Sequence, residues 1–381
     1  MAATTFTSLP AKSVVEYALP AAAQTHEVLA VSDNLLLVSQ QSDGSLVKVS
    51  LGEHGQITGA HKYTPTNPWS GLHGLAKATT SIPGLIWATL QFDNKVLLIN
   101  PNTNDINQPP QVLSGKTISV PSPARGPHGI IEHNGNLWLT CKDSSHIVRI
   151  SIANPSDHQV WPVRGRPIFV AVHPTSGDLY ASLDSSSRIW HYSGNNGNNG
   201  QELPIPTEEG STPVGMIAGA DGNIWFVLAG SKTTGTGTFG RILPTAIMEF
   251  FTLSSPLGSK AGLLHLAWGK DATQLYLLGS SIINPDGINA VFTVKIENTV
   301  GGTAHARIVV QNAVVLPTQR SATHRIILHR GSLYVTELLT STLAHVSGAV
   351  MEGLQVSETW DDFGLWRLGA KADVVVYNQT A

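Results

Sequence analysis

Short apolar stretches separated by polar turns recur along this chain at intervals of roughly 40 to 60 residues, the spacing of propeller blades. The clearest copy has apolar stretches at 126–130, 137–140 and 147–150, divided by a Gly-Asn turn and a polar loop. The copies begin near Thr25, Leu72, Gly126, Pro167, Pro213, Leu264 and His324. Apolar stretches of this length, bounded by turn residues, predict β-strands.

One copy is too small to bury its own apolar face, so the copies must pack against one another around an axis. The pattern therefore predicts an all-β fold, a seven-bladed β-propeller, formed by residues 26–346 within a single domain of residues 1–381. Residues 13–20 have the pattern of an outer strand but precede the first copy, so we expect them to close the ring by joining the seventh blade.

Residues 347–381 leave the repeat and form a C-terminal tail. Trp360, Phe363 and Trp366 in this tail are expected to anchor it against the ring, with a partner interface as the alternative.

Composition narrows the function classes. Charged residues make up 13% of the chain, the formal net charge is −3, and no cluster of Lys and Arg appears, which argues against nucleic-acid binding. No apolar run has the length of a membrane helix, and residues 1–19 lack the pattern of a secretory signal. The single Cys141 excludes an internal disulfide framework and favours a reducing, cytoplasmic location.

In a propeller the first strand of each blade lines the central channel, so equivalent positions form rings at its mouth. The first strands supply His26, His73, His128, Ile168, Val214, Leu264 and His324, with His265 one position out of register. The ends of the second strands supply Gln40, Leu90, Cys141, Leu183, Leu228, Gly279 and Glu337. We expect imidazoles on one arc of the mouth and an apolar wall on the other, as in small-molecule pockets.

Each group at this mouth has a predicted role. His324 is the candidate general acid or base, and Glu337 beside it would orient the ring. The predicted substrate-binding residues are His26, His73, His128, His265, Gln40, Arg325, Phe169, Leu183 and Leu228. Two alternatives stay open: that the histidines only satisfy one another at the neck of the ring, and that they bind a divalent metal ion.

Three phrases, 127–130, 221–226 and 16–20, resemble those of the streptogramin B lyase (virginiamycin B lyase) family. The resemblance implies a seven-bladed propeller and, in that family, elimination by a histidine base with a magnesium ion. His324 and Thr336-Glu337 match the family's catalytic phrase. Ala322 stands where the family has a metal-binding carboxylate, and Arg325 replaces a glycine, so we predict no metal or other cofactor, with Mg²⁺ as the alternative.

The chain also looks like diverged fungal propellers of secondary metabolism, among them hetero-Diels–Alderases. This resemblance implies an enzyme that binds an apolar, terpenoid- or polyketide-like small molecule and cyclises it without a cofactor, because holding two reactants in place removes much of the entropic barrier. A metal-dependent C–O lyase and a non-catalytic binding propeller are the alternatives. The sequence predicts a small-molecule partner, no nucleic acid and no membrane, and leaves the oligomeric state open.

Overall fold

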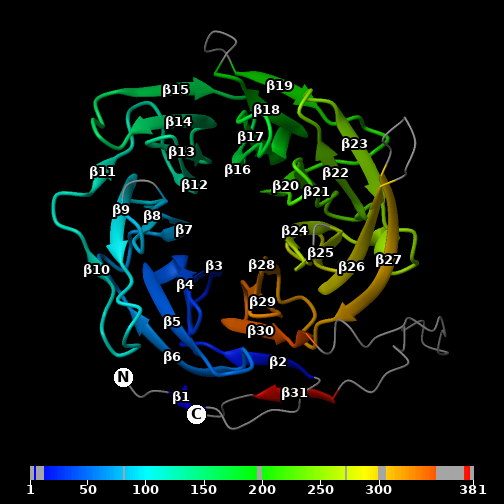
Figure 1. Cartoon of the computed structure of the whole chain (residues 1–381), viewed down its shortest axis with the longest axis horizontal. Coiled ribbons are helices and arrows are strands. Elements are labelled where there is room, and N and C mark those ends of the chain that lie inside the picture. The colour runs from blue at the N-terminus through cyan, green and yellow to red at the C-terminus, as the bar shows by residue number, and fades with distance from the viewer. Residues whose placement is uncertain are drawn as a thin grey trace.

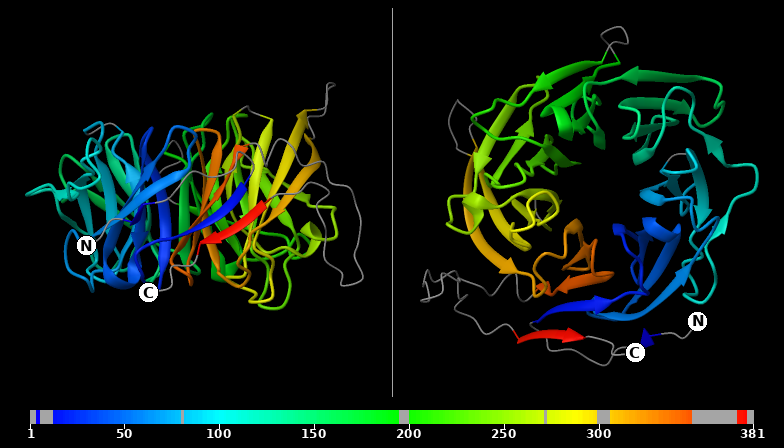
Figure 2. Two further views of the ribbon diagram at one scale, coloured as in Figure 1. Left: turned by 90° about the horizontal axis from the view of Figure 1, so that it is seen from below. Right: turned by 180° about the vertical axis from the view of Figure 1, so that it is seen from behind.

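The computed structural model describes residues 4–5, 13–79, 82–194, 200–270, 273–298, 306–348 and 373–377. Seven sheets, antiparallel except for one outer strand pair, are arranged around a central axis (Figure 1), so the prediction of a seven-bladed, all-β propeller is confirmed. Seen edge-on, the ring is a flat disc whose strands cross its thickness (Figure 2). The tail aromatics Trp360, Phe363 and Trp366 lie outside the described residues.

The blades follow one another in sequence, and each runs from an inner to an outer strand. Blade 1 consists of β3 (Thr25–Ser32), β4 (Leu35–Gln40), β5 (Ser45–Leu51) and β6 (Ile57–Tyr63), with β1 (Thr4–Thr5) outside β6. Blade 2 consists of β7 (Leu72–Lys77), β8 (Ile86–Leu90), β9 (Lys95–Asn100), β10 (Gln111–Val112) and β11 (Ile118–Ser119). Blade 3 consists of β12 (Pro127–His133), β13 (Asn136–Cys141), β14 (His146–Ser151) and β15 (His158–Pro162).

Blade 4 consists of β16 (Pro167–Val172), β17 (Leu179–Leu183), β18 (Arg188–Tyr192) and β19 (Gln201–Pro204). Blade 5 consists of β20 (Pro213–Ala218), β21 (Ile224–Leu228), β22 (Thr238–Ile242) and β23 (Met248–Thr252). Blade 6 consists of β24 (Leu263–Trp268), β25 (Gln274–Gly279), β26 (Ala290–Asn298) and β27 (Ala306–Val315). Blade 7 contains β28 (Thr323–His329), β29 (Ser332–Glu337) and β30 (Thr342–Val346). Three short 3₁₀ turns are η1 (Gln41–Asp43), η2 (Asp184–Ser186) and η3 (Gly258–Lys260).

The fourth strand of blade 7 comes from the beginning of the chain. Strand β2 (Ser13–Ala18) pairs antiparallel with β30, with Val14 opposite Val346 and Ala18 opposite Thr342. The predicted closure of the ring by the N-terminal strand is therefore confirmed. Strand β31 (Asp373–Tyr377) runs parallel to β2 on its outer side (Figure 1).

Local sequence explains the blade geometry. In blade 3, Asn134 and Gly135 both have positive φ angles, of 49° and 71°, which suits the tight turn joining β12 to β13. Near the start of the inner strand, each blade has a register shift, as between Pro127 and Ile130. Such a β-bulge sets two residues of the inner strand against one of the second strand.

The hydrophobic core consists of seven clusters, each shared by two consecutive blades. The cluster between blades 7 and 1 includes Tyr17, Leu36 and Tyr334, all fully buried. Burial of one blade against the next is thus what holds the ring together, as expected for repeats that cannot bury their faces alone. Within the described residues, no helix has the length and apolar character that crossing a bilayer requires.

Candidate functional site

The bulges bring two consecutive residues of every inner strand to the channel. The first bulge positions hold His26, His73, His128, Ile168, Val214, Leu264 and His324. The second positions hold Glu27, Gly74, Gly129, Phe169, Gly215, His265 and Arg325. His265, which looked out of register in the sequence, occupies the second position, like Phe169 and Arg325.

Four imidazoles from blades 7, 1, 2 and 3 gather at the first bulge positions. The ring centroids of His26 and His73 lie 4.3 Å apart, those of His73 and His128 3.8 Å, and those of His26 and His324 4.7 Å. All four side chains are almost completely buried. The structure therefore brings together residues that are far apart in the sequence: His26 and His324 are 298 positions apart.

Backbone carbonyl groups orient three of these rings. The Nδ1 atom of His73 lies 3.3 Å from the His128 carbonyl, that of His128 3.2 Å from the Ile168 carbonyl, and that of His324 3.3 Å from the His26 carbonyl. A carbonyl can only accept, so these contacts assign the proton to Nδ1 and leave each Nε2 atom as an acceptor. In each case the carbonyl belongs to the next blade.

Burial lowers the pKa of every one of these imidazoles. It lowers the pKa of His324 to about 3, with Arg325 adding to the effect. The pKa values of His26, His73 and His128 lie well below 6.5, first because of burial and then because of neighbouring imidazoles and Lys142. The rings are consequently neutral at pH 7 and act as hydrogen-bonding groups rather than as cations.

The second bulge positions form a charged and aromatic group across the channel. The Arg325 guanidinium lies 5.3 Å from the centre of the Phe169 ring, and its Nε atom is 3.4 Å from the Glu27 carboxylate. The Phe169 ring is 5.1 Å from His265 and 6.4 Å from His128. Phe169 of blade 4 therefore reaches side chains from blades 3, 6 and 7, so it fills the channel near its axis.

Polar side chains surround the channel on one face of the ring, which we call the mouth face. It carries the loops that join the second to the third strand of each blade. Lys142 follows β13 there, and its charge lowers the pKa of His26, His73, His128 and His324. Burial lowers the pKa of Lys142 itself, and nearby Arg166 adds to this.

Two hydrogen-bonded pairs fix the rim around Lys142. Gln91 accepts a hydrogen bond from Gln41 at 2.7 Å and donates to Asp143 at 3.1 Å. Asp184 accepts two hydrogen bonds from Arg166, at 3.1 and 2.9 Å. These carboxylates are engaged with other partners, and no hydrogen bond or salt bridge is found for the Lys142 ammonium within the described part of the chain.

The predicted pairing of Glu337 with His324 is wrong. Glu337 accepts hydrogen bonds from Ser321, at 2.7 Å, and from Thr342, and it lies directly opposite Thr323. Residues opposite one another share a face, and neighbours in a strand alternate, so Glu337 lies on the other side of the sheet from His324. The carboxylate nearest His324 is that of Glu27, 3.9 Å from its Nδ1 atom.

Three other predicted binding residues are enclosed in the protein interior instead of facing the mouth. Leu183 is fully buried in the cluster between blades 3 and 4, and Leu228 in that between blades 4 and 5. Gln40 is also fully buried and donates to the Pro20 carbonyl at 2.7 Å. The last residue of each second strand points into the space between blades, which is why the second predicted ring does not line the channel.

The sequence-based reasoning missed Glu27 and Lys142. A signal for Glu27 was present, because it follows His26 directly, as Arg325 follows His324. Lys142 also directly follows a predicted ring position, Cys141. Neither residue repeats in other blades, so comparing the copies with one another did not reveal them.

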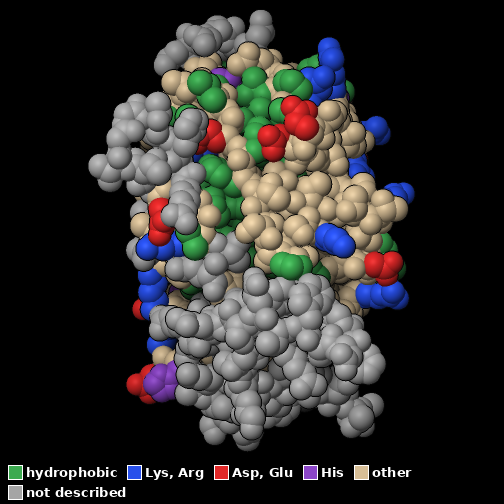
Figure 3. All heavy atoms as spheres, turned by 90° about the vertical axis from the view of Figure 1, so that its right-hand side faces the viewer, with side chains coloured by type: hydrophobic (Ala, Val, Ile, Leu, Met, Phe, Trp, Pro, Cys, Tyr) green, Lys and Arg blue, Asp and Glu red, His purple; other side chains and the backbone are tan. Residues whose placement is uncertain are grey.

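Large apolar side chains also lie on the mouth face. Trp69 is 78% exposed, Phe92 58% and Leu339 61%, and each lies in a loop next to the inner end of a blade. On the flank of the ring (Figure 3), hydrophobic side chains are instead scattered over a mainly polar surface, and the visible cations form no continuous band.

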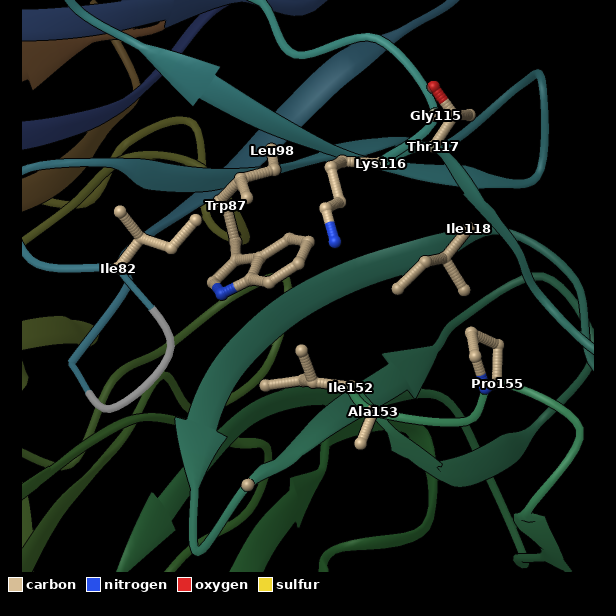
Figure 4. A pocket seen from close by; sticks show the side chains of 11 residues that line it. Ile82, Trp87, Leu98, Gly115, Lys116, Thr117, Ile118, Ile152, Ala153 and Pro155 are labelled. Atoms are coloured by element: carbon tan, nitrogen blue, oxygen red, sulfur yellow. The ribbon is translucent and has the colours of Figure 1, made fainter.

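A separate pocket of about 720 Å³ lies between blades 2 and 3, away from the channel. Trp87, Ile118, Lys116 and Ile152 point into it (Figure 4). Among the described residues that line it, Lys116 alone carries a charge, and no acidic side chain stands with it. The convergent polar groups are therefore at the channel and not in this pocket.

Comparison with solved structures agrees with this fold. Virginiamycin B lyase from Staphylococcus aureus superimposes with a TM-score of 0.64 at 17% sequence identity, over 88% of this chain and 99% of the lyase. The chain has a streptogramin-lyase-like propeller fold. A further streptogramin B lyase structure gives a TM-score of 0.62 at 20% identity, covering 87% of this chain and 96% of that one. At these identities the similarity concerns the fold alone.

The propeller shape is shared widely. The Kuenenia stuttgartiensis hydrazine synthase matches with a TM-score of 0.63 at 13% identity, over 87% of this chain and 97% of that chain. No protein-family model matches the sequence. No curated protein matches it either.

Proposed function

We propose that this protein is an enzyme that binds an apolar, oxygen-bearing small molecule at the mouth of the channel and cyclises it, for example by a hetero-Diels–Alder reaction. The observation that carries the proposal is the Lys142 ammonium, which has no hydrogen bond or salt bridge among the described residues and whose charge acts on the neutral imidazoles of the channel. A partly buried donor that no described side chain engages is suited to a substrate oxygen that gains negative charge in the transition state.

The surroundings of Lys142 fit an apolar substrate. Trp69, Phe92 and Leu339, in loops of blades 1, 2 and 7, expose apolar surface that an apolar substrate could cover. Phe169 and Arg325 close the channel behind the imidazoles. A substrate held between this apolar rim and Lys142 would be oriented at both ends, which lowers the entropic barrier to joining two groups.

The chemistry requires nothing that the side chains cannot supply. In a hetero-Diels–Alder reaction an enone and an alkene form one C–O and one C–C bond, while the remaining double bond shifts; no atom, proton or electron is lost. Lys142 would donate to the enone oxygen and make the enone more electron-poor. Secondary metabolism and a cytoplasmic location, favoured by the single Cys141, belong to this proposal.

A metal-dependent C–O lyase is the second candidate, because of His324. Its Nδ1 atom contacts the His26 carbonyl, so its Nε2 atom can accept a proton from a substrate carbon as the C–O bond breaks. The fold of the streptogramin lyases, one of which is known as a catalytically inactive variant with quinupristin, gives this candidate its plausibility. The low pKa of His324, about 3, makes it a weak base, which favours cyclisation.

The proposal is tested by incubating the protein with a reactive enone and a terpene alkene and measuring the cycloadduct by chromatography and mass spectrometry. Lys142→Met should lower kcat/KM about 100-fold, the effect of removing one oxyanion donor. Lys77→Met, at an exposed position at the far end of β7, is the matched control and should react at the wild-type rate.

Three outcomes separate the candidates. Equal rates for wild type and Lys142→Met would remove Lys142 from the mechanism. Turnover of a cyclic depsipeptide that EDTA abolishes and Mg²⁺ restores would favour the lyase. Failure to bind or convert any small molecule would favour a non-catalytic binding propeller.

A further inference from the structure

We infer that His26, His73 and His324 form a binding site for one divalent transition-metal ion, with Zn²⁺ as the representative case. The inference goes beyond the proposed function and does not depend on it, because it concerns metal binding and not turnover. It rests on three observations: the spacing of three ring nitrogens, the hydrogen bonds on the far sides of two rings, and a surplus of buried acceptors.

The spacing of the nitrogens suits a small ion. His26 Nδ1 lies 3.0 Å from His73 Nε2 and 3.4 Å from His324 Nε2. All three atoms lie within 4.8 Å of one another. Zinc–imidazole bonds of about 2.0–2.1 Å in a tetrahedral arrangement set their nitrogens about 3.3 Å apart. Two of the three separations already fit this value, and the rings must move only as far as the third requires.

The outer nitrogens of two of these rings already have the partners that metal-bound histidines need. The Nδ1 atoms of His73 and His324 each contact a backbone carbonyl, of His128 and His26 respectively, at 3.3 Å. Such a contact holds the proton on Nδ1 and directs the Nε2 lone pair inward. These tautomers are set by the backbone of the next blade, so they do not depend on an ion being bound.

The three histidines His26, His73 and His324, which we call the trio, also have more inward-facing hydrogen-bond acceptors than donors. With the Nε2 atoms of His73 and His324 both unprotonated, a proton on His26 Nδ1 can bond to only one of them well. His26 Nε2 is buried without a hydrogen-bond partner among the described residues. A bound cation would use all three inward lone pairs and would leave the His26 proton on Nε2.

The ligand type and the nearby charges define which ion fits. Three imidazoles and no carboxylate favour Zn²⁺, Co²⁺, Ni²⁺ or Cu²⁺ over Mg²⁺, which prefers oxygen. The fourth position of a tetrahedral ion would be open toward the channel for water or a ligand. The charge of Lys142 opposes the ion, whereas the Glu27 carboxylate, with its Oε1 atom unpaired, partly compensates.

The experiment is a titration of the full-length, metal-stripped protein with Zn²⁺ by calorimetry and with Co²⁺ by visible spectroscopy. We expect one ion per chain and the strong visible absorption of tetrahedral Co²⁺. His73→Gln should weaken Zn²⁺ binding about 100-fold or more, since even loss of an outer partner costs 10- to 100-fold. His265→Gln, a buried channel imidazole outside the trio, should bind Zn²⁺ like the wild type.

Two further measurements keep the result decisive. Thermal unfolding of each variant shows whether it is folded, and His324→Gln replaces His73→Gln if the latter is not. Lys142→Met should tighten Zn²⁺ binding, because it removes a like charge. Absence of Zn²⁺ and Co²⁺ binding by the wild type, equal affinity of the folded His73→Gln variant, or a preference for Mg²⁺ would each overturn the inference.

Discussion

In blades 3 and 7, a threonine stands one residue before the end of the second strand. Its hydroxyl group connects the bulge of its own blade to the inner strand of the next blade. In blade 3, Thr140 accepts a hydrogen bond from the Gly129 amide at 2.8 Å and donates to the Ile168 carbonyl of blade 4 at 2.8 Å. Thr336 does the same for the Arg325 amide and the His26 carbonyl, at 3.0 and 2.5 Å. The hydroxyl therefore stabilises the bulge that presents the imidazoles.

Replacing Thr336 by valine tests this role at the residue scale. Valine has nearly the same shape but leaves the partly buried Arg325 amide without its partner, so Thr336→Val should lower the free energy of unfolding by about 1–2 kcal/mol, measured by urea denaturation. The control is Thr252→Val, at the exposed end of the outer strand β23, for which we expect a change below about 0.5 kcal/mol. Equal effects would exclude a special role for Thr336.

At the scale of the element, the closing strand carries a buried carboxyl pair. Glu16 of β2 accepts hydrogen bonds from Thr318, and Glu337 of β29 accepts from Ser321 and Thr342. Burial raises the pKa of Glu337 to about 7, and the charge of Glu16 adds to this. The pairing of β2 with the rest of blade 7 is therefore more stable when Glu337 is protonated.

The sign of this effect gives a prediction. Because the folded protein holds the Glu337 proton more tightly than the unfolded chain, the stabilisation is complete below pH 4.5 and is lost as the pH rises toward 7. Glu337→Gln should therefore become more stable relative to the wild type over this range, by up to roughly 3 kcal/mol. Urea denaturation at pH 5 and pH 8 measures the difference; Glu208→Gln, an exposed carboxyl, is the control. A constant difference between the two pH values would contradict the prediction.

The bulges explain which parts of the site could be predicted from the sequence. The recurrence of His at equivalent positions was enough to bring His26, His73, His128 and His324 to one channel. Alternation along a regular strand cannot reveal an inserted residue, so the second bulge positions, including Glu27, were not recognised as a ring. The face occupied by Glu337 was mistaken for a related reason: position along the chain does not show which side of a sheet a side chain occupies.

At the scale of the whole molecule, buried neutral imidazoles make the fold sensitive to acid. The pKa values of His26, His73, His128 and His265 are lowered by burial, that of His324 falls to about 3 and that of His345 to about 4. Repetition predicted the ring, its blade number and its closure, since every copy needs neighbours. It could not predict these pKa values, which depend on how completely each ring is enclosed.

A lowered imidazole pKa means that the unfolded chain takes up protons that the folded protein excludes, so stability falls as the pH drops below 6.5. Six such rings outnumber the two carboxyl groups whose pKa values are raised, Glu27 and Glu337, so the free energy of unfolding should fall as the pH drops from 6.5 toward 5. Urea midpoints at several pH values between 7 and 4.5 would measure this slope; a flat profile would refute it.

The contribution of one imidazole, that of His345, to the pH dependence of the free energy of unfolding can be measured separately. Both of its ring nitrogens are buried without hydrogen-bond partners among the described residues, and its ring packs 5.3 Å from that of Tyr334. His345→Phe keeps the ring and removes the titration, so the slope should decrease by about 1.4 kcal/mol per pH unit. The stability at pH 7 should be unchanged or higher.

The mixed origin of blade 7 has a consequence for how the protein forms during synthesis. In blades 1 to 6, the four strands from the inner to the outer edge come from one continuous stretch of chain and can begin to pair as soon as they leave the ribosome. The last blade cannot be completed until β30 has emerged to meet β2, which was translated first. Until then β2 has an unpaired edge, so a chaperone that shields this edge would protect the nascent chain from aggregation at its most exposed stage.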